Sequence, residues 1–179
     1  MAGTDGALQE PRADYSSLLE SLEASELLSL IEMAQSRLQE ITNRNLSAEP
    51  DKLFIDSQYN IRLGSPQGAT LPLRPLVKAL FLLFLKHPEG ILLKQRAQYA
   101  EELDEIYSVI SPNVDRDERH RRILRLVDIQ DNSFSEKAST LNATLDKILT
   151  PPLSQSYKIN GTNGHPRRIP LSPLLVEWQ

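Results

Sequence analysis

One segment, residues 71–91, constrains the fold of this chain more than any other, because it encodes an extended entry, a buried helix and a stop in succession. Pro75 suits the first turn of a helix, since the N–H that proline lacks would have no intrahelical partner there. The apolar residues that follow fall at helical spacing: Leu76, Leu80, Leu83 and Phe84. His87-Pro88-Glu89-Gly90 ends the pattern, because proline cannot continue a helix. The segment therefore predicts a buried helix from Pro75 to about His87.

Short extended segments precede this helix. Leu53–Ile55 and Tyr59–Leu63 flank the turn residues 56–58, and Ala69–Leu73 follows a Gly- and Pro-containing turn. These three pieces predict a small antiparallel sheet.

Three further helices are expected after the buried one. An amphipathic pattern runs from Leu93 to Val109, and a second runs from Asp117 to Val127 with arginines on its outer side. The third helix begins at Ser133 and ends before Pro151-Pro152. Ser133 and Glu136 have the spacing of a capping box, in which each side chain accepts a hydrogen bond from a free N–H of the first turn.

The end of the chain has the pattern of a β-hairpin. Tyr157–Ile159 and Arg168–Leu171 are strand-like and flank Asn160–Gly164, which holds two Asn-Gly pairs able to adopt positive φ.

The first 45 residues differ from the rest. Residues 1–13 lack periodicity and are expected to be a disordered tail, and residues 14–45 predict an amphipathic helix. Its apolar seam has alternating spacings of four and three: Leu27, Ile31, Ala34, Leu38 and Ile41. The seam is short for a coiled coil, so both pairing with a second helix and docking onto the same chain remain open. A polar linker then leads to a domain over residues 51–179.

Composition limits the classes of protein to which the chain can belong. Its 179 residues suffice for one domain with an appendage. Residues 1–50 hold three basic and nine acidic side chains, whereas residues 51–179 hold 17 and 15, so any nucleic-acid-binding surface must be local. No signal peptide or membrane-spanning run is expected, and the absence of cysteine fits a reducing compartment, which together predict a cytoplasmic protein that does not bind membranes.

From residue 53 to 171, the order of strand, helices and hairpin resembles the winged-helix DNA-binding domain of OmpR-type response regulators. The residues that carry the resemblance are Leu73-Arg-Pro-Leu76, His87-Pro-Glu-Gly-Ile91, the helix from Ser133 and the hairpin from Tyr157 to Leu171. The resemblance implies an α+β fold of the winged helix-turn-helix type: a small antiparallel sheet, three to four helices and a C-terminal wing, here preceded by the amphipathic helix. It further implies that the helix from Ser133 lies in the major groove of double-stranded DNA and that the wing contacts the backbone.

Three groups of residues are candidates for nucleic-acid binding. On the helix from Ser133 they are Lys137, Ser139, Thr140 and Lys147; in the wing they are Lys158, His165, Arg167 and Arg168; and on the preceding helix they are Arg121, Arg122 and Arg125. The arginines of the last group have an alternative role, because Glu118–Arg122 and Asp117–Arg121 are spaced for ion pairs within the helix.

Two functions are compatible with these patterns. The first is a DNA-binding transcriptional regulator or accessory protein, acting as a homodimer or with a protein partner bound by the N-terminal helix. The second is a protein-interaction module on a winged-helix scaffold, favoured by the nearly neutral outer face of the helix from Ser133. The three histidines lack ligand spacing and no nucleotide-binding or nucleophile motif occurs, so we expect no metal, no cofactor and no enzymatic activity.

Overall fold

The computed structural model describes residues 21–46, 49–151 and 153–179, and the side chains of 39–48 are not among the described ones. The chain divides into two units, residues 1–44 and 45–179. The tail predicted over residues 1–13 and the first part of the helix predicted from residue 14 lie outside the described residues.

The described part of the first unit is a helix, α2 (Ala24–Leu46). It begins after Glu23, whose N–H donates to Glu26 Oε2 at 2.9 Å, so the acidic side chain three positions on satisfies one of the free amides.

The second unit has an α+β fold with a three-stranded mixed sheet, in the order β2-β1-β3. Strand β1 (Leu53–Ile55) pairs antiparallel with β2 (Ile61–Leu63) and parallel with β3 (Val176–Trp178). The prediction of an antiparallel sheet was therefore wrong in its third strand, because β3 was not predicted and pairs in the parallel sense. The chain returns to β1 only after all the helices of this unit, and a strand that returns by such a crossover can pair in the parallel sense. The predicted third strand is reduced to a bridge between Thr70 and Arg62.

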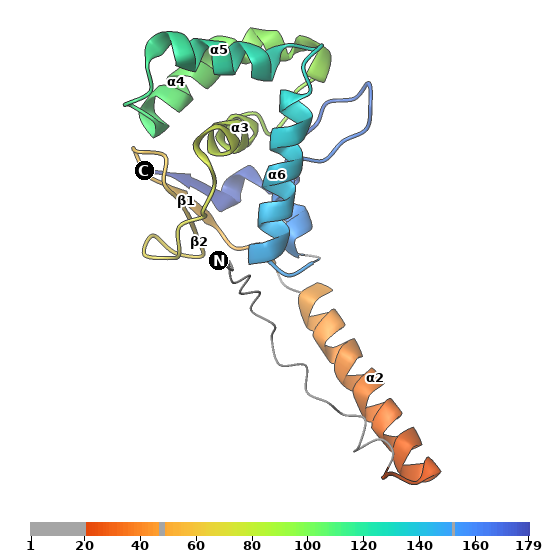
Figure 1. Cartoon of the computed structure of the whole chain (residues 1–179). Helices are drawn as coiled ribbons and strands as arrows, with labels where there is room; N and C mark the ends of the chain where they lie inside the picture. The colour runs from red at the N-terminus through yellow and green to blue at the C-terminus, as the bar shows by residue number, and fades with distance from the viewer. Residues whose placement is uncertain (1–20, 47–48, 152) are drawn as a thin grey trace, which may run out of the picture. The chain divides into compact units, whose positions relative to one another are not determined.

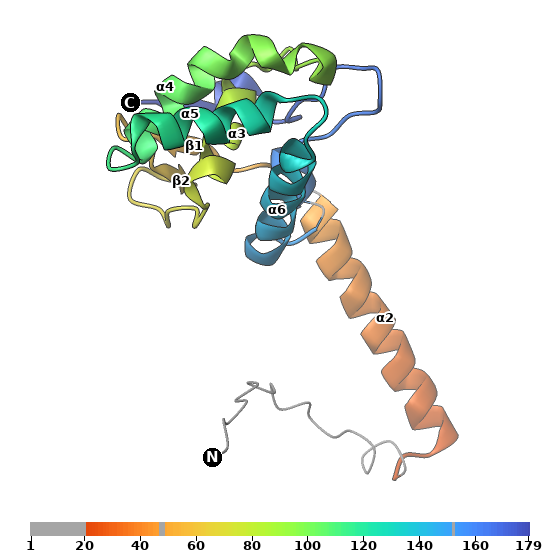
Figure 2. The same ribbon diagram turned by 45° about the horizontal axis from the view of Figure 1, so that its top comes forward.

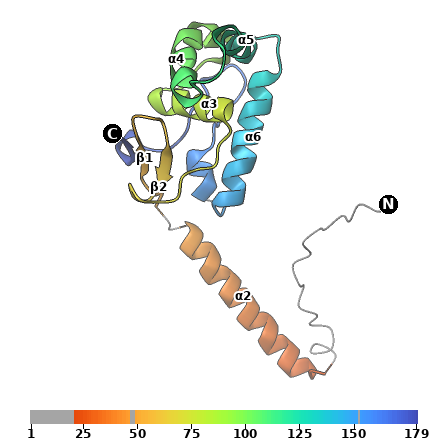
Figure 3. The same ribbon diagram turned by 60° about the vertical axis from the view of Figure 1, so that its left-hand side comes forward.

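Helix α3 (Pro75–Lys86) is the centre of the second unit (Figure 1). Val77 and every residue from Ala79 to Leu85 are buried, so the helix is enclosed on nearly all sides. The buried helix predicted from Pro75 is confirmed, with its end at Lys86 and His87 as the C-cap. Figure 3 shows α3 between the sheet and α6.

Helix α4 (Ala100–Ile110) packs on α3, and α5 (Arg116–Val127) lies beside α4 (Figure 2). The helix predicted from Leu93 starts instead as a 3₁₀ helix, Leu93–Tyr99, before α4 begins.

Arg96 is turned inward in this segment, 8% exposed, and its Nη2 donates to the carbonyl oxygen of Asp128. The guanidinium also lies 5.3 Å from the ring centre of Phe134. An amphipathic pattern cannot predict a buried arginine, because the carbonyl groups that bind it are distant in sequence.

Helix α6 (Ser133–Ile148) follows α5 after a short turn. The predicted capping box is wrong: Ser133 is buried, and its N–H donates to Asp131 Oδ1 at 2.7 Å. Asp131 accepts the N–H that Glu136 would bind in a capping box, and Glu136 lies exposed.

The predicted hairpin is present as a short pairing of residues. Asn160 and Arg168 exchange two backbone hydrogen bonds of 2.9 Å, and Arg167 exchanges another two with Ile91, at 2.8 and 2.9 Å. The predicted strand at Tyr157–Ile159 begins instead as a 3₁₀ helix, Leu153–Tyr157. Gly90 makes the contact with Arg167 possible: its φ is +95°, and a Cβ there would lie 2.9 Å from the Arg167 carbonyl oxygen. This order of elements is compatible with a winged helix.

His87 joins the end of α3 to α4. Its Nδ1 lies 2.8 Å from Glu89 Oε1, and its Nε2 lies 2.8 Å from Glu102 Oε2. Both ring nitrogens can donate only when the imidazole is protonated. Burial opposes the charge, but the hydrogen bonds to Glu102 and Glu89 outweigh burial and raise the pKa of His87 above its ordinary 6.5.

We expect this arrangement to make stability depend on pH. The contribution of protonated His87 is complete below pH 6.5 and is lost as the pH rises through its raised folded pKa. The bond from His87 lowers the pKa of Glu89 below 4.5, so the carboxylate's contribution is present above pH 4.5 and lost as the pH falls through the lowered value. Replacement His87→Gln should therefore cost roughly 1 kcal/mol of unfolding free energy at about pH 5.5 and less at about pH 8.5.

Urea unfolding at both pH values measures this difference. The matched control is His120→Gln, since His120 is exposed on α5. A cost for His87→Gln that is equal at the two pH values, or equal to that of the control, would contradict the assignment.

Candidate nucleic-acid interface

Helix α6 has an apolar side in the core and a polar side at the surface. The buried residues are Phe134, Ala138, Leu141 and Leu145. Among the candidates on this helix, Ser139, Thr140 and Lys147 are exposed, and Lys137 is partly exposed with its Nζ 3.7 Å from Glu136 Oε2. The Thr140 hydroxyl donates to the carbonyl oxygen of Glu136 at 2.8 Å, so towards a ligand it can act only as an acceptor.

The same helix binds the chain segment that leads into the wing. The N–H of Ile159 donates to Asn142 Oδ1 at 3.3 Å, and Asn142 Nδ2 donates back to the Ile159 carbonyl oxygen at 3.5 Å. One turn further along α6, Asp146 accepts hydrogen bonds from Ser154 and Lys158. The position of the wing relative to α6 is thus set by side chains of α6 itself.

Lys158 is engaged by this contact. Its side chain is 10% exposed, and its Nζ lies 2.6 Å from Asp146 Oδ1. The hydrogen bond from Lys158, followed by that from Ser154, lowers the pKa of Asp146. The structure therefore places Lys158 inside the domain, where it positions the wing and does not present a charge to a ligand.

The other wing candidates differ from one another in exposure. His165 and Arg168 are exposed, and within the described residues the Arg168 side chain has no ion pair. Arg167 is partly buried, and its Nε is buried without a hydrogen-bond partner in the described part of the chain. Arg168 and His165 are therefore the wing side chains that a ligand can reach.

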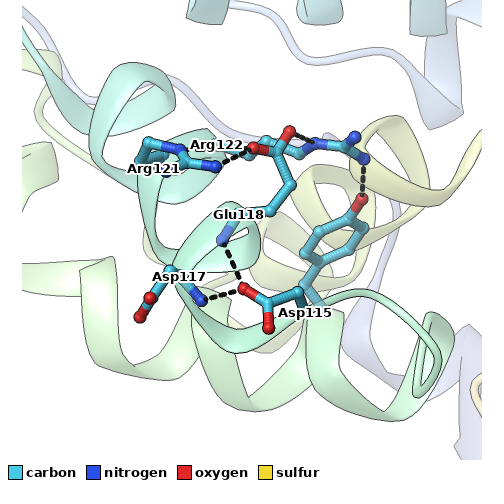
Figure 4. A network of polar contacts seen from close by, with 6 residues as sticks. Asp115, Asp117, Glu118, Arg121 and Arg122 are labelled. Carbon is cyan, nitrogen blue, oxygen red and sulfur yellow. Dashed lines mark hydrogen bonds and ion pairs between the residues drawn. The ribbon is translucent and has the colours of Figure 1, made fainter.

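The arginines of α5 form ion pairs along their own helix. Arg121 Nη2 and Arg122 Nε each lie 2.7 Å from one carboxylate oxygen of Glu118, and Figure 4 shows both guanidinium groups pointing toward it. These two hydrogen bonds, that of Arg121 first, lower the pKa of Glu118. The Glu118–Arg122 pair expected from the sequence is present, whereas Arg121 pairs with Glu118 and not with Asp117. Two cations thus share one carboxylate.

Asp115 and Asp131 complete the polar contacts around α5. The side chain of Asp115 caps the helix and accepts from the N–H groups of Asp117 and Glu118, at 2.9 and 3.3 Å (Figure 4). Arg125 Nε lies 3.1 Å from Asp131 Oδ2, and the Arg125 side chain is 74% exposed. Exposed ion pairs of this kind contribute little to stability, so an external anion can replace the carboxylate.

A cavity of about 430 Å³ lies between the start of α3, helix α5 and the first turns of α6. It brings together Arg122, Arg125, Lys137 and Thr140 from the predicted set. Arg74 also lines the cavity and was missed by the sequence analysis, because it is a single basic residue before Pro75 and belongs to no basic cluster. Asn142 was missed because an amide within an amphipathic helix gives no signal of the backbone it binds.

The apolar seam of α2 is largely open to solvent in its described part. Ile31 and Leu38 are 50% and 67% exposed, Ala34 is exposed and Leu27 is partly exposed. The side chain of Ile41 lies outside the described residues.

Among the described residues, no group of three or more His, Asp or Glu side chains could hold a metal ion. No described helix is long and apolar enough to span a membrane. Comparison of the chain with protein-family models, with curated proteins and with solved structures finds no match.

We expect Asn142→Ala to loosen the start of the wing at Ile159, whose backbone Asn142 binds. Loss of one hydrogen bond of about 1 kcal/mol should speed exchange of the Ile159 amide hydrogen by roughly fivefold. Hydrogen–deuterium exchange followed by NMR measures this rate. Ser139→Ala, an exposed position on the same helix, is the control and should leave the rate unchanged; equal rates in both variants would show that Asn142 does not hold the wing.

Proposed function

We propose that this protein binds double-stranded DNA through the exposed side of α6 and the wing, as a transcriptional regulator or accessory protein with a winged helix-turn-helix domain. The observation that carries the proposal is the pairing of three separate segments. Arg167 pairs with Ile91, which lies between the first two helices of the domain, and its neighbour Arg168 pairs with Asn160 across the wing. The pairing with Ile91 ties the wing to the segment after α3, and the hydrogen bonds between Asn142 and Ile159 tie the start of the wing to α6.

The charges at this surface support weak and salt-dependent binding. Arg168 and Lys147 are exposed and have no ion pair within the described residues, and Arg121 and Arg122 share one carboxylate. These side chains suit contacts to phosphate groups, which supply most of the affinity in nonspecific complexes. Ser139 and Thr140 are short polar groups that can contact base edges but give little discrimination without a bidentate partner. The proposed complex therefore depends on backbone contacts more than on base recognition.

The test is charge reversal at Arg168. We expect Arg168→Glu to weaken binding to a mixed-sequence duplex by about tenfold or more at low salt, because one phosphate contact is replaced by repulsion. Fluorescence anisotropy with a labelled duplex, measured over a range of salt concentrations, gives the affinity and its salt dependence. Arg167 is unsuitable for this test, since its buried Nε would be removed as well.

The control variant is Arg116→Glu, which makes the same change of charge at an exposed position at the start of α5. No binding by the unmodified protein at low salt, or equal effects of the two substitutions, would contradict DNA binding through the wing.

The exposed apolar seam of α2 favours a second candidate function, a protein-interaction module. Apolar side chains at helical spacing are rarely left in water over such a length unless they bind a partner. Met33, outside the seam, is 62% exposed as well, so the apolar surface is broader than the seam alone.

Leu38→Asp tests this candidate in the full chain. If α2 pairs with a second copy, the sedimentation coefficient of the unmodified protein should rise with concentration, and that rise should disappear in the variant. Gln35→Asp, at an exposed neighbouring position, should leave association unchanged. If the unmodified protein stays monomeric at all concentrations, self-association through this helix is ruled out.

A further inference from the structure

The cavity between α3, α5 and α6 has the composition of an anion-binding site. Among the lining residues the one carboxylate is that of Glu136. The cationic side chains that line the cavity are Arg74, Arg122, Arg125 and Lys137. They come from two helices, α5 and α6, and from the loop before α3, so the excess of positive charge arises only in the folded domain.

Two of these cations lack a strong partner. Arg74 is exposed, and its side chain has no hydrogen bond or ion pair in the described part of the chain. Lys137 has a long ion pair, with its Nζ 3.7 Å from Oε2 of the neighbouring Glu136. Both side chains can therefore turn toward a ligand without breaking a short internal contact.

A third cation is held in place by groups that a ligand need not displace. Arg122 Nε binds Glu118, and its Nη1 donates to the Tyr107 hydroxyl at 3.0 Å. Tyr107 is 2% exposed, so this contact comes from the core of the domain. Within the described residues Arg122 Nη2 makes no hydrogen bond, which leaves a fixed donor for an anionic oxygen.

The start of α3 adds a further positive element. This helix of 12 residues has no side-chain cap at its N-terminus and no acidic residue in its first turn. Its first-turn residues Leu76 and Val77 line the cavity. The first amide groups of a helix have no intrahelical acceptor, and together with the helix dipole they favour an anion nearby.

The shape and walls of the cavity restrict the class of ligand. A volume of about 430 Å³ lies within the usual range for small-molecule sites, which is roughly 300–1,000 Å³. Pro75, Leu76 and Val77 supply an apolar part of the lining, beside the charged groups of α5 and α6. A phosphate of a DNA backbone would use the cations but would leave this apolar part without a partner.

We propose that this cavity binds a small organic anion, a phosphate ester or carboxylate with an apolar body, and that it is a ligand site separate from the DNA-contacting wing. The anionic group binds Arg74, Lys137 and Arg122, and the apolar body lies against the first turn of α3. The site stands on different residues from Arg168 and does not require that the protein binds DNA.

The experiment titrates the full chain with phenyl phosphate and with benzoate as probes, and with inorganic phosphate for comparison, by NMR of the backbone amides. We expect saturable binding of phenyl phosphate or benzoate at millimolar concentration, with shifts at residues 74, 76, 77, 133 and 140. Phenyl phosphate should bind more tightly than inorganic phosphate, because its ring also buries apolar surface. Arg74→Gln and Lys137→Gln should each weaken binding by about tenfold.

Arg168→Gln is the matched control, since it removes the same type of charge at the wing; it should leave the binding of the probes unchanged. Failure of both phenyl phosphate and benzoate to bind, equal affinities for phenyl phosphate and inorganic phosphate, or equal effects of Arg74→Gln and Arg168→Gln would each overturn the proposal. A loss of duplex binding in Arg74→Gln without any binding of the small probes would also overturn it, and would assign the cavity to a DNA phosphate. If Arg168→Gln alone loses duplex binding and still binds the probes, the cavity is a site separate from the wing, as proposed.

Discussion

The burial of α3 is the constraint on which the arrangement of the second unit depends. A helix with Val77 and seven consecutive residues from Ala79 to Leu85 buried must be covered on several sides at once, and the sheet, α4 and α6 supply that cover (Figures 1 and 3). Burying each of the larger apolar side chains contributes about 1.5–3 kcal/mol, so α3 supplies a large part of the stability of this unit. The polar side of α6, the wing and the charged cavity are all positioned by elements that pack on this helix.

The sequence predicted these elements well where the signal is local. Pro75 and the turn at His87–Gly90 gave both ends of α3, and the apolar positions of α6 gave its buried side, because one helix face determines each pattern. Two of the failures involve contacts between distant residues. The parallel pairing of β3 and the inward turn of Arg96 depend on partners tens of residues away. The capping box failed because of a near neighbour: Asp131, two residues before Ser133, accepts the Ser133 N–H that Glu136 was expected to bind.

In the candidate site, too, the local sequence identifies the residues, whereas the fold decides which of them can bind a ligand. The sequence located the basic side chains but could not show which of them are already paired. Lys158 is engaged by Asp146, and Arg121 and Arg122 share Glu118 (Figure 4), whereas Arg168 remains exposed at the wing. Arg74 shows the reverse case: a single residue in a loop becomes part of a charged cavity once α5 and α6 are in place. Pairing, more than composition, therefore decides where this chain can bind an anion.

The most direct test of the account is to map a bound duplex onto the full chain by NMR of the backbone amides. We expect the largest shifts on adding a mixed-sequence duplex at low salt to fall on the exposed positions 135–147 of α6 and on the wing, residues 160–168. Shifts confined to α2, or spread without preference over the second unit, would contradict the claim that α3 positions α6 and the wing as a surface for DNA.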